Sequence, residues 1–126
     1  TATNAAATAI DQQALMGRVS DGFRDTSQVA DIYGTVVCTN ARLDHGEKLA
    51  EAALAVVPGA DIILLGFETS AEAYETFIAR GCDLVTEDYS TLVDHRKRRQ
   101  PADQQWVIFG LGLDMGSPSG TTSQSD

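Results

Sequence analysis

The chain has 126 residues, of which 43% are hydrophobic, and this length suits one domain with its own core. Nine basic residues against 18 acidic ones give a net charge of −9, which argues against nucleic acid or an anionic membrane surface as the main partner. No apolar run approaches the ~18 residues that a membrane-spanning helix needs.

Residues 1–24 are interpreted as an N-terminal extension. They lack the charged-then-apolar layout of a signal peptide, which leaves open a cytosolic protein or a processed exported one. The apolar spacing from Ile10 to Val19 predicts a short amphipathic helix, which Gly17 weakens. A second short helix is expected to follow, with Thr26 or Ser27 as its cap.

Residues 34–88 contain three short apolar runs that alternate with two segments of helical apolar spacing. That alternation is typical of a βαβαβ unit with a parallel sheet. We therefore predict an α/β fold, a three-layer open sheet with a mainly parallel core. Strands are expected at 34–39, 62–67, 82–86 and Trp106–Phe109. The run at 62–67 is apolar on both faces, which favours a strand in the middle of the sheet.

Three helices are predicted around these strands, each with an N-terminal cap signal. Asp44 is expected to begin the first helix, and Thr69 with Glu72 forms a capping box for the second. Asp88 or Ser90 is expected to begin the third. The residues predicted to face the sheet are Leu49, Ala52, Ala53, Val56, Ala73, Phe77, Ile78, Leu92 and Val93.

Candidate binding residues follow from the topology, because ligands of open α/β sheets bind beyond the carboxyl ends of the strands. This rule selects the loops at 39–44, 67–70 and 86–90. The carboxylate of Asp88, at a strand end and a helix start, can receive an ammonium group; the alternative is a plain helix cap. The first loop, TNARLDHG, has no phosphate-binding glycine pattern, which argues against a nucleotide.

The histidines and cysteines give weaker signals. His45 and His95 lack metal-ligand spacing, so both are expected at the surface, and no metal or other cofactor is predicted. A Cys38–His45 nucleophile lacks an orienting third group, so we expect no enzyme. Cys38 and Cys82 lie on strands that the fold can place side by side, and both a disulfide in an oxidising compartment and two free thiols stay open.

The sequence also carries a series of motifs: GTVVC, then GFET before an A-E-A-Y helix, then ARGCDLVTEDYSTLVDHR. This series resembles the second lobe of the periplasmic amino-acid-binding proteins of ABC transporters, the type 2 solute-binding fold with its Rossmann-like lobes. It is most similar to the general L-amino-acid subgroup. The matching residues are Val37-Cys38, Gly81-Cys82-Asp83 and Thr86-Glu87-Asp88, followed by Ser90-Thr91-Leu92, within a likeness over about residues 25–110.

The resemblance implies one wall of an amino-acid cleft, in which Asp88 takes the α-amino group of the ligand. It also implies a Cys38–Cys82 disulfide and a periplasmic or secreted protein. The loop that grips the α-carboxylate departs from the family's T-G-T/S pattern, since this chain has ARLD at 41–44. The ligand-binding residues expected on this basis are Asp88, Thr86, Thr39, Asn40, Arg42 and Thr69.

We expect residues 25–113 to form this lobe and 114–126 a flexible polar tail. The main hypothesis is a ligand-binding module, truncated to one lobe, that binds an amino acid or related small molecule and forms a homo-oligomer through its exposed wall. The alternative is a protein-interaction or structural domain of solute-binding ancestry without a small ligand. In that case the basic run at 95–99 would be a docking patch for an acidic protein partner.

Overall fold

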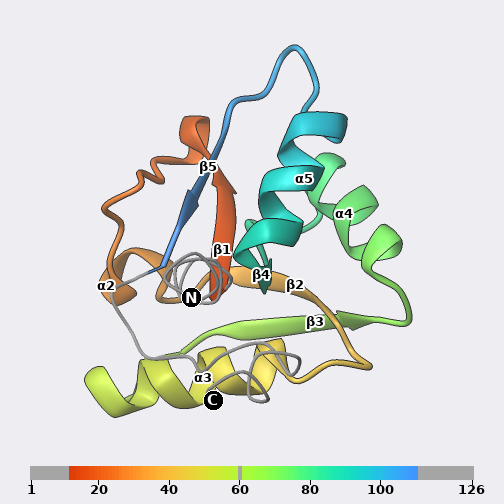
Figure 1. Cartoon of the computed structure of the whole chain (residues 1–126). Coiled ribbons are helices and arrows are strands. Elements are labelled where there is room, and N and C mark those ends of the chain that lie inside the picture. The colour runs from red at the N-terminus through yellow and green to blue at the C-terminus, as the bar shows by residue number, and fades with distance from the viewer. Residues whose placement is uncertain (1–11, 60, 111–126) are drawn as a thin grey trace, which may run out of the picture.

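The computed structural model describes residues 12–59 and 61–110 and contains a five-stranded sheet in the order β3-β2-β4-β1-β5 (Figure 1). β2 runs parallel to both β3 and β4, whereas β1 runs antiparallel to β4 and β5. The predicted open α/β fold with a parallel βαβαβ core is therefore confirmed. The strands are β1 (Gln13–Arg18), β2 (Val36–Asn40), β3 (Ile63–Phe67), β4 (Leu84–Asp88) and β5 (Trp106–Phe109).

Helices cover both faces of the sheet and give the three expected layers (Figure 1). One core, between the sheet and the helices α4 and α5, contains Tyr74, Phe77 and Leu92. The other core lies between the sheet and the helices α2 and α3 and contains Ile32 and Leu49. The helices are α2 (Val29–Ile32), α3 (His45–Val56), α4 (Ser70–Ile78) and α5 (Tyr89–Arg99), and a 3-10 turn, η1 (Val19–Asp21), follows β1.

The N-terminal helix predicted from residue 10 to 19 is wrong, because Gln13–Arg18 form the strand β1. All six residues of β1 are buried between β4 and β5. A Cβ atom on Gly17 would lie 2.7 Å from both Leu84 and Phe23, so the close packing requires glycine there. A short apolar run buried on both faces has no period that separates a strand from a helix. Residues 10 and 11, where the predicted helix would begin, lie outside the described part of the chain.

The prediction that residues 62–67 form a central strand is also wrong. β3 lies at one lateral edge of the sheet, and Ile63, Leu64 and Leu65 are 50%, 38% and 37% exposed. The chain reverses its direction of travel across the sheet after β3, since β2 lies between β3 and β4. The strand order depends on long-range packing, which the apolar run itself does not encode.

The structure has some of the predicted helix caps and lacks others. The Thr69–Glu72 capping box of α4 is present in both directions. Asp44 and Asp88 occupy the N-cap positions of α3 and α5, but neither side chain makes a capping hydrogen bond. Helix α2 is capped by Gln28 instead of Thr26 or Ser27. On α3, Val56 is 56% exposed and does not face the sheet as expected.

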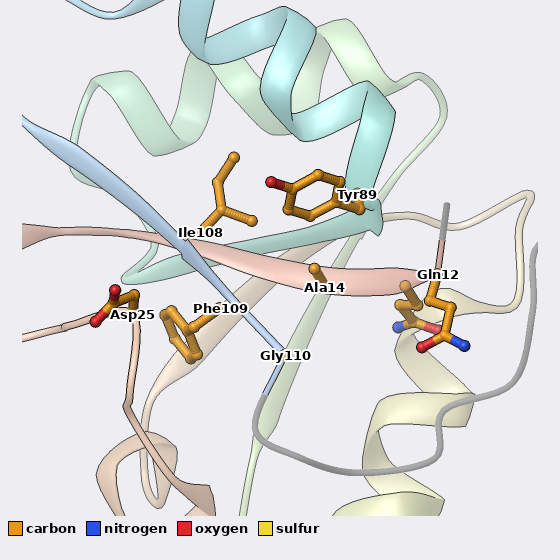
Figure 2. A pocket seen from close by; sticks show the side chains of 8 residues that line it. Gln12, Ala14, Asp25, Tyr89, Ile108, Phe109 and Gly110 are labelled. Atoms are coloured by element: carbon orange, nitrogen blue, oxygen red, sulfur yellow. The ribbon is translucent and has the colours of Figure 1, made fainter. Parts of the chain in front are cut away.

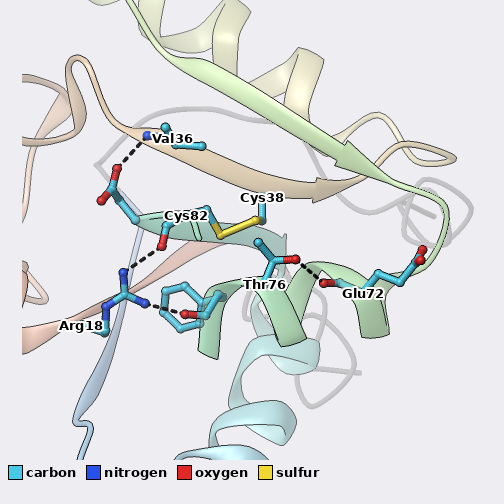
Figure 3. Close-up of a disulfide and its surroundings, with 8 residues drawn as sticks. Arg18, Val36, Cys38, Glu72, Thr76 and Cys82 are labelled. Atoms are coloured by element: carbon cyan, nitrogen blue, oxygen red, sulfur yellow. Dashed lines mark hydrogen bonds between the residues drawn. A yellow bond between two sulfur atoms is a disulfide. The ribbon is translucent and has the colours of Figure 1, made fainter. Parts of the chain in front are cut away.

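A disulfide joins Cys38, in the middle of β2, to Cys82, just before β4 (Figure 3). The two Cα atoms are 6.0 Å apart, within the usual range for such bonds. The disulfide that the resemblance implied is thus present. Because it links the two central parallel strands, it holds together the strands whose carboxyl ends carry the candidate site.

Arg18, at the end of β1, lies beside the start of β4 and contacts the segment that carries Cys82. Its side chain is buried and donates hydrogen bonds to the carbonyl oxygens of Phe77 (2.7 Å) and Cys82 (2.8 Å) (Figure 3). It also pairs with Asp21. Its guanidinium also lies 4.6 Å from the centroid of the Phe77 ring. This one side chain fixes the turn between α4 and β4 to the end of β1.

Candidate functional site

The carboxyl ends of β2 and β4 meet the first turns of α3 and α4 at one end of the sheet, here called the site end. The predicted residues Thr39 and Asn40 end β2, and Thr86 and Asp88 end β4. Because side chains alternate along a strand, these residues divide between the two faces of the sheet. Thr39, Thr86 and Asp88 face α3, whereas Asn40 faces α4.

The central contact on the α3 face joins Asp88 to His45. Nε2 of His45 lies 2.8 Å from Oδ1 of Asp88. The His45 side chain is 11% exposed and that of Asp88 is 24% exposed. The expectation of a surface histidine is therefore wrong for His45, because its position at the first residue of α3 directs the ring toward the end of β4.

Gln13 connects β1 to this pair. Its Nε2 donates to the carbonyl oxygen of His45 (2.6 Å) and to Oγ1 of Thr86 (2.9 Å). Thr86 in turn donates to the carbonyl oxygen of Ala14 (2.9 Å). Sequence reasoning missed Gln13, since the segment was predicted to be a short amphipathic helix. The strand places Gln13 directly opposite Asp88 in the antiparallel register.

Three buried polar atoms on this face have no hydrogen-bond partner among the described residues. They are Oε1 of Gln13, Oγ1 of Thr39 and Nδ1 of His45. Buried polar groups are nearly always paired in native proteins, by protein, water or ligand atoms. The three atoms therefore indicate a place where water or a polar ligand supplies the missing partners.

A second polar group lies on the α4 face. Nδ2 of Asn40 donates to Oγ of Ser70 (3.0 Å), and Ser70 donates to the carboxylate of Glu87. Burial raises the pKa of the Glu87 carboxyl, while the hydrogen bond from Ser70 and the charge of His45 oppose this shift. The loops selected from the sequence contain Ser70 and Glu87, but neither residue was among the expected ligand-binding residues.

Tyr74 of α4 and His95 of α5 lie on the same face of the sheet as Asn40, Ser70 and Glu87. Their rings stack with centroids 3.5 Å apart, and the Tyr74 hydroxyl has no hydrogen-bond partner in the described part of the chain. Burial raises the pKa of Tyr74, and the charges of Glu87 and Asp88 add to the shift. Burial lowers the pKa of His95. His95 is half-buried between α5 and α4, and is therefore less exposed than a free surface histidine.

Arg42 and Thr69 do not join either polar group. Nη2 of Arg42 lies 3.4 Å from Oε1 of Glu68, and both side chains are mostly exposed. The Thr69 hydroxyl accepts from the backbone N–H of Glu72 as part of the helix cap. These two predicted residues therefore lie near the site end but outside its buried part.

A cavity of about 260 Å³ opens next to the site end, where β1 begins and β5 ends (Figure 2). Tyr89, Ile108 and Phe109 form part of its wall. Gln12 and Gln13 line it as well, and Gln13 lies opposite Asp88 in the strand register. Gln13 thus borders both this cavity and the polar group around His45. The volume is slightly below the range typical of small-molecule sites.

The described residues contain no cluster of three or more His, Cys, Asp or Glu side chains suited to a metal ion. Cys38 is bonded to Cys82 and is not available as a nucleophile, so the Cys38–His45 arrangement is ruled out in this state. No helix in the described part of the chain is long and apolar enough to cross a bilayer.

Models of known protein families give no match to this sequence, and a search of curated proteins gives no similar sequence. Solved structures, in contrast, share the fold. A periplasmic binding protein of an ABC transporter from Brucella ovis, solved with glutathione bound, is 23% identical with a TM-score of 0.68, over 82% of this chain and 33% of that chain.

Two further similar structures bind amino acids. An ancestral arginine-binding protein bound to arginine is 17% identical with a TM-score of 0.64, over 90% of this chain and 49% of that chain. The GluR0 ligand-binding core from Nostoc punctiforme, in complex with L-glutamate, is 22% identical with a TM-score of 0.59, over 79% of this chain and 41% of that chain.

This chain spans less than half the length of each of these three proteins. At these identities the likeness establishes the fold, which is that of a lobe of the periplasmic solute-binding proteins. The structural comparison therefore confirms the solute-binding fold that the sequence motifs resembled.

Proposed function

We propose that this chain is a ligand-binding lobe that forms one wall of a site for a small molecule with an ammonium group, an amino acid or a close relative. The observation that carries the proposal is the position of Asp88 at the carboxyl end of the central strand β4, beside buried polar atoms that lack partners. Binding, and not catalysis, is the proposed activity.

The chemistry of the α3 face suits an ammonium donor. An ammonium group has three N–H bonds to donate and no lone pair to accept one. The carboxylate of Asp88 and Oε1 of Gln13 are both acceptors, and the latter is buried without a donor among the described residues. The Asp88 side chain is 24% exposed, so a ligand can reach it from solvent. His45 would share the carboxylate with the ligand or turn away.

The loop between β2 and α3 is poorly suited to bind the anionic end of such a ligand. The loop between β2 and α3 carries Arg42, which is exposed and pairs with Glu68, and it carries Asp44 at the start of α3. A negative residue at a helix N-terminus opposes a bound carboxylate. We therefore propose that a second lobe, outside this chain, holds that end of the ligand, as the coverage of the similar structures supports.

The proposed compartment is the periplasm or the outside of the cell. The buried Cys38–Cys82 disulfide supports it, because disulfides persist in oxidising environments and are rare in the cytosol.

A second candidate is a protein-interaction domain that uses this fold without a small ligand. The contact between His45 and Asp88 favours it, since the carboxylate that would receive the ammonium group already has a partner. Under this hypothesis the polar groups of the site end serve stability alone.

Isothermal titration with each of the common amino acids separates the two candidates. At least one is expected to bind weakly, because half a cleft buries little of the ligand. Asp88→Asn is expected to weaken that binding about tenfold or more, the effect of losing one charge-assisted hydrogen bond. Asp103→Asn, in an exposed turn away from the site end, is the matched control and should bind as the wild type does.

An absence of binding by the wild-type chain to every amino acid would reject the ligand-binding proposal and favour the interaction domain. Equal affinities of the wild type and Asp88→Asn would reject the role of Asp88.

A further inference from the structure

The β3 edge of the sheet is a surface separate from the site end. β2 pairs with one side of β3, and no described residue pairs with the other side. Ile63, Leu64 and Leu65 present apolar side chains to solvent on both faces of this edge. At the opposite edge, by contrast, the residues of β5 are buried or half-buried. Exposed apolar edge strands are templates for pairing with another strand.

The backbone of β3 has hydrogen-bonding groups directed at the open side. The N–H of Ile63 donates to Thr35 (3.0 Å), and the carbonyl oxygen of Phe67 accepts from Ala41 (2.7 Å), so these residues bond toward β2. Along a strand the direction of these groups alternates with each residue. The N–H and C=O groups of Leu64 and Gly66 therefore point away from β2.

We propose that two copies of this chain pair through β3, antiparallel, and continue the sheet across a two-fold axis at Leu65. In this register Leu64 lies opposite the partner's Gly66, and the four outward backbone groups of this pair meet as hydrogen-bonded partners. Leu65 lies opposite the partner's Leu65, and Ile63 opposite the partner's Phe67. The inference is independent of the proposed ligand, which binds at the site end.

Two features favour a second copy as the occupant. The register is self-complementary, because the large side chain of Leu64 meets a residue without a side chain on the same face. The charges at the two ends of the strand are also complementary. Asp61 is exposed before β3, and Arg42, which also pairs with Glu68 of its own chain, is exposed beside its end. The antiparallel arrangement brings Asp61 toward the partner's Arg42.

Cysteine cross-linking tests the register. Directly opposed residues in a non-hydrogen-bonded antiparallel pair have Cα atoms about 4.5 Å apart, within reach of a disulfide. Leu65→Cys is therefore expected to form a covalent dimer when incubated with oxidised glutathione, and a reducing agent should reverse it. Ile63→Cys is the matched control: its two copies would lie four residues apart, about 14 Å, and should not cross-link efficiently.

Measurement of the mass in solution tests the association without oxidation. The wild type is expected at twice the mass of the chain at high concentration and to dissociate on dilution. Leu64→Pro removes an outward N–H and no bond to β2, so it should give a folded monomer. Leu54→Lys changes an exposed leucine on α3, 50% exposed against 38% for Leu64, and should leave the dimer intact.

A wild type that stays monomeric over the whole concentration range would overturn the proposal. Equal cross-linking of Leu65→Cys and Ile63→Cys would overturn it as well, since random collisions or another register would then explain the covalent dimer. Circular dichroism of each variant distinguishes a folded monomer from an unfolded chain.

Discussion

Glu87 and Asp88 are adjacent carboxylates with different environments. Strand alternation directs Glu87 toward α4, where it is buried and accepts from Ser70, and Asp88 toward α3, where it meets His45. The sheet itself therefore separates two acidic groups that are neighbours in sequence. Asp88 contacts a histidine, and Glu87 accepts a hydrogen bond from the hydroxyl of Ser70.

The Glu87 carboxyl is expected to make stability depend on pH. Burial raises its pKa in the folded protein, so the folded state keeps this proton to a higher pH than the unfolded chain does. The resulting stability is present below the unfolded-state pKa of about 4.3 and is lost as the pH rises through the folded-state pKa. Glu87→Gln mimics the protonated form and should be more stable than the wild type at pH 7.

Urea unfolding of both proteins between pH 7 and about pH 4 measures this effect. The difference in free energy of unfolding should shrink as the pH falls, because the wild-type carboxyl becomes protonated. A variant that is less stable than the wild type at pH 7 would contradict the interpretation of Glu87.

At the scale of elements, α4 is the helix with the most complete local signal. Thr69 accepts from the N–H of Glu72, and the Glu72 carboxylate accepts from the N–H of Thr69, so the cap satisfies two backbone donors. The sequence contains both residues at the right spacing, which is why this helix could be predicted from the local pattern alone.

Thr69→Ala is expected to destabilise the protein by about 1 kcal/mol, since it leaves a donor of the first turn without a side-chain partner. Thr69→Ser keeps the hydroxyl and should lose little of this stability. Denaturant unfolding at neutral pH compares the two. A similar loss in both variants would argue that the methyl group of Thr69, and not its hydroxyl, contributes the stability.

Among the other elements, those defined by local sequence were predicted correctly, and those defined by long-range contacts were not. The strand from Trp106 to Phe109 was predicted from its short apolar run alone. β1 was not predicted, since its residues are buried on both faces and such a run fits two periods. The position of β3 at the edge also required the strand order, which is a property of the whole sheet.

The candidate site, too, could be predicted only in part. The rule that ligands bind at strand ends selected Thr39, Thr86 and Asp88, and the structure brings them to one face. Gln13 and His45 came from no sequence pattern, because their roles depend on β1 lying next to β4 and on the direction of the first turn of α3. Tertiary contacts of this kind have no local signature.

At the scale of the whole molecule, the Cys38–Cys82 disulfide closes a loop with a sequence separation of 44. On the chain-entropy model such a link stabilises the folded state by about 4 kcal/mol, because it restricts the unfolded chain. That amount is a large part of the stability of a small domain. The fold is therefore expected to depend on oxidation.

The double variant Cys38→Ala/Cys82→Ala is expected to unfold at a much lower urea concentration than the oxidised wild type. Wild-type protein unfolded in the presence of a reducing agent should behave like the double variant. If the reducing agent leaves the unfolding midpoint of the wild type unchanged, the bond contributes no stability in solution.

The pairing of β1 with β5 has a consequence for how this unit can be built into larger proteins. Leu15 lies opposite Phe109, so the chain enters the sheet and leaves it at adjacent positions. A unit whose entry and exit are neighbours can be spliced into a surface loop of a host protein without separating the two ends of that loop. By the same geometry, a short linker between residues 12 and 110 would permit a circular permutant with new termini in an exposed turn.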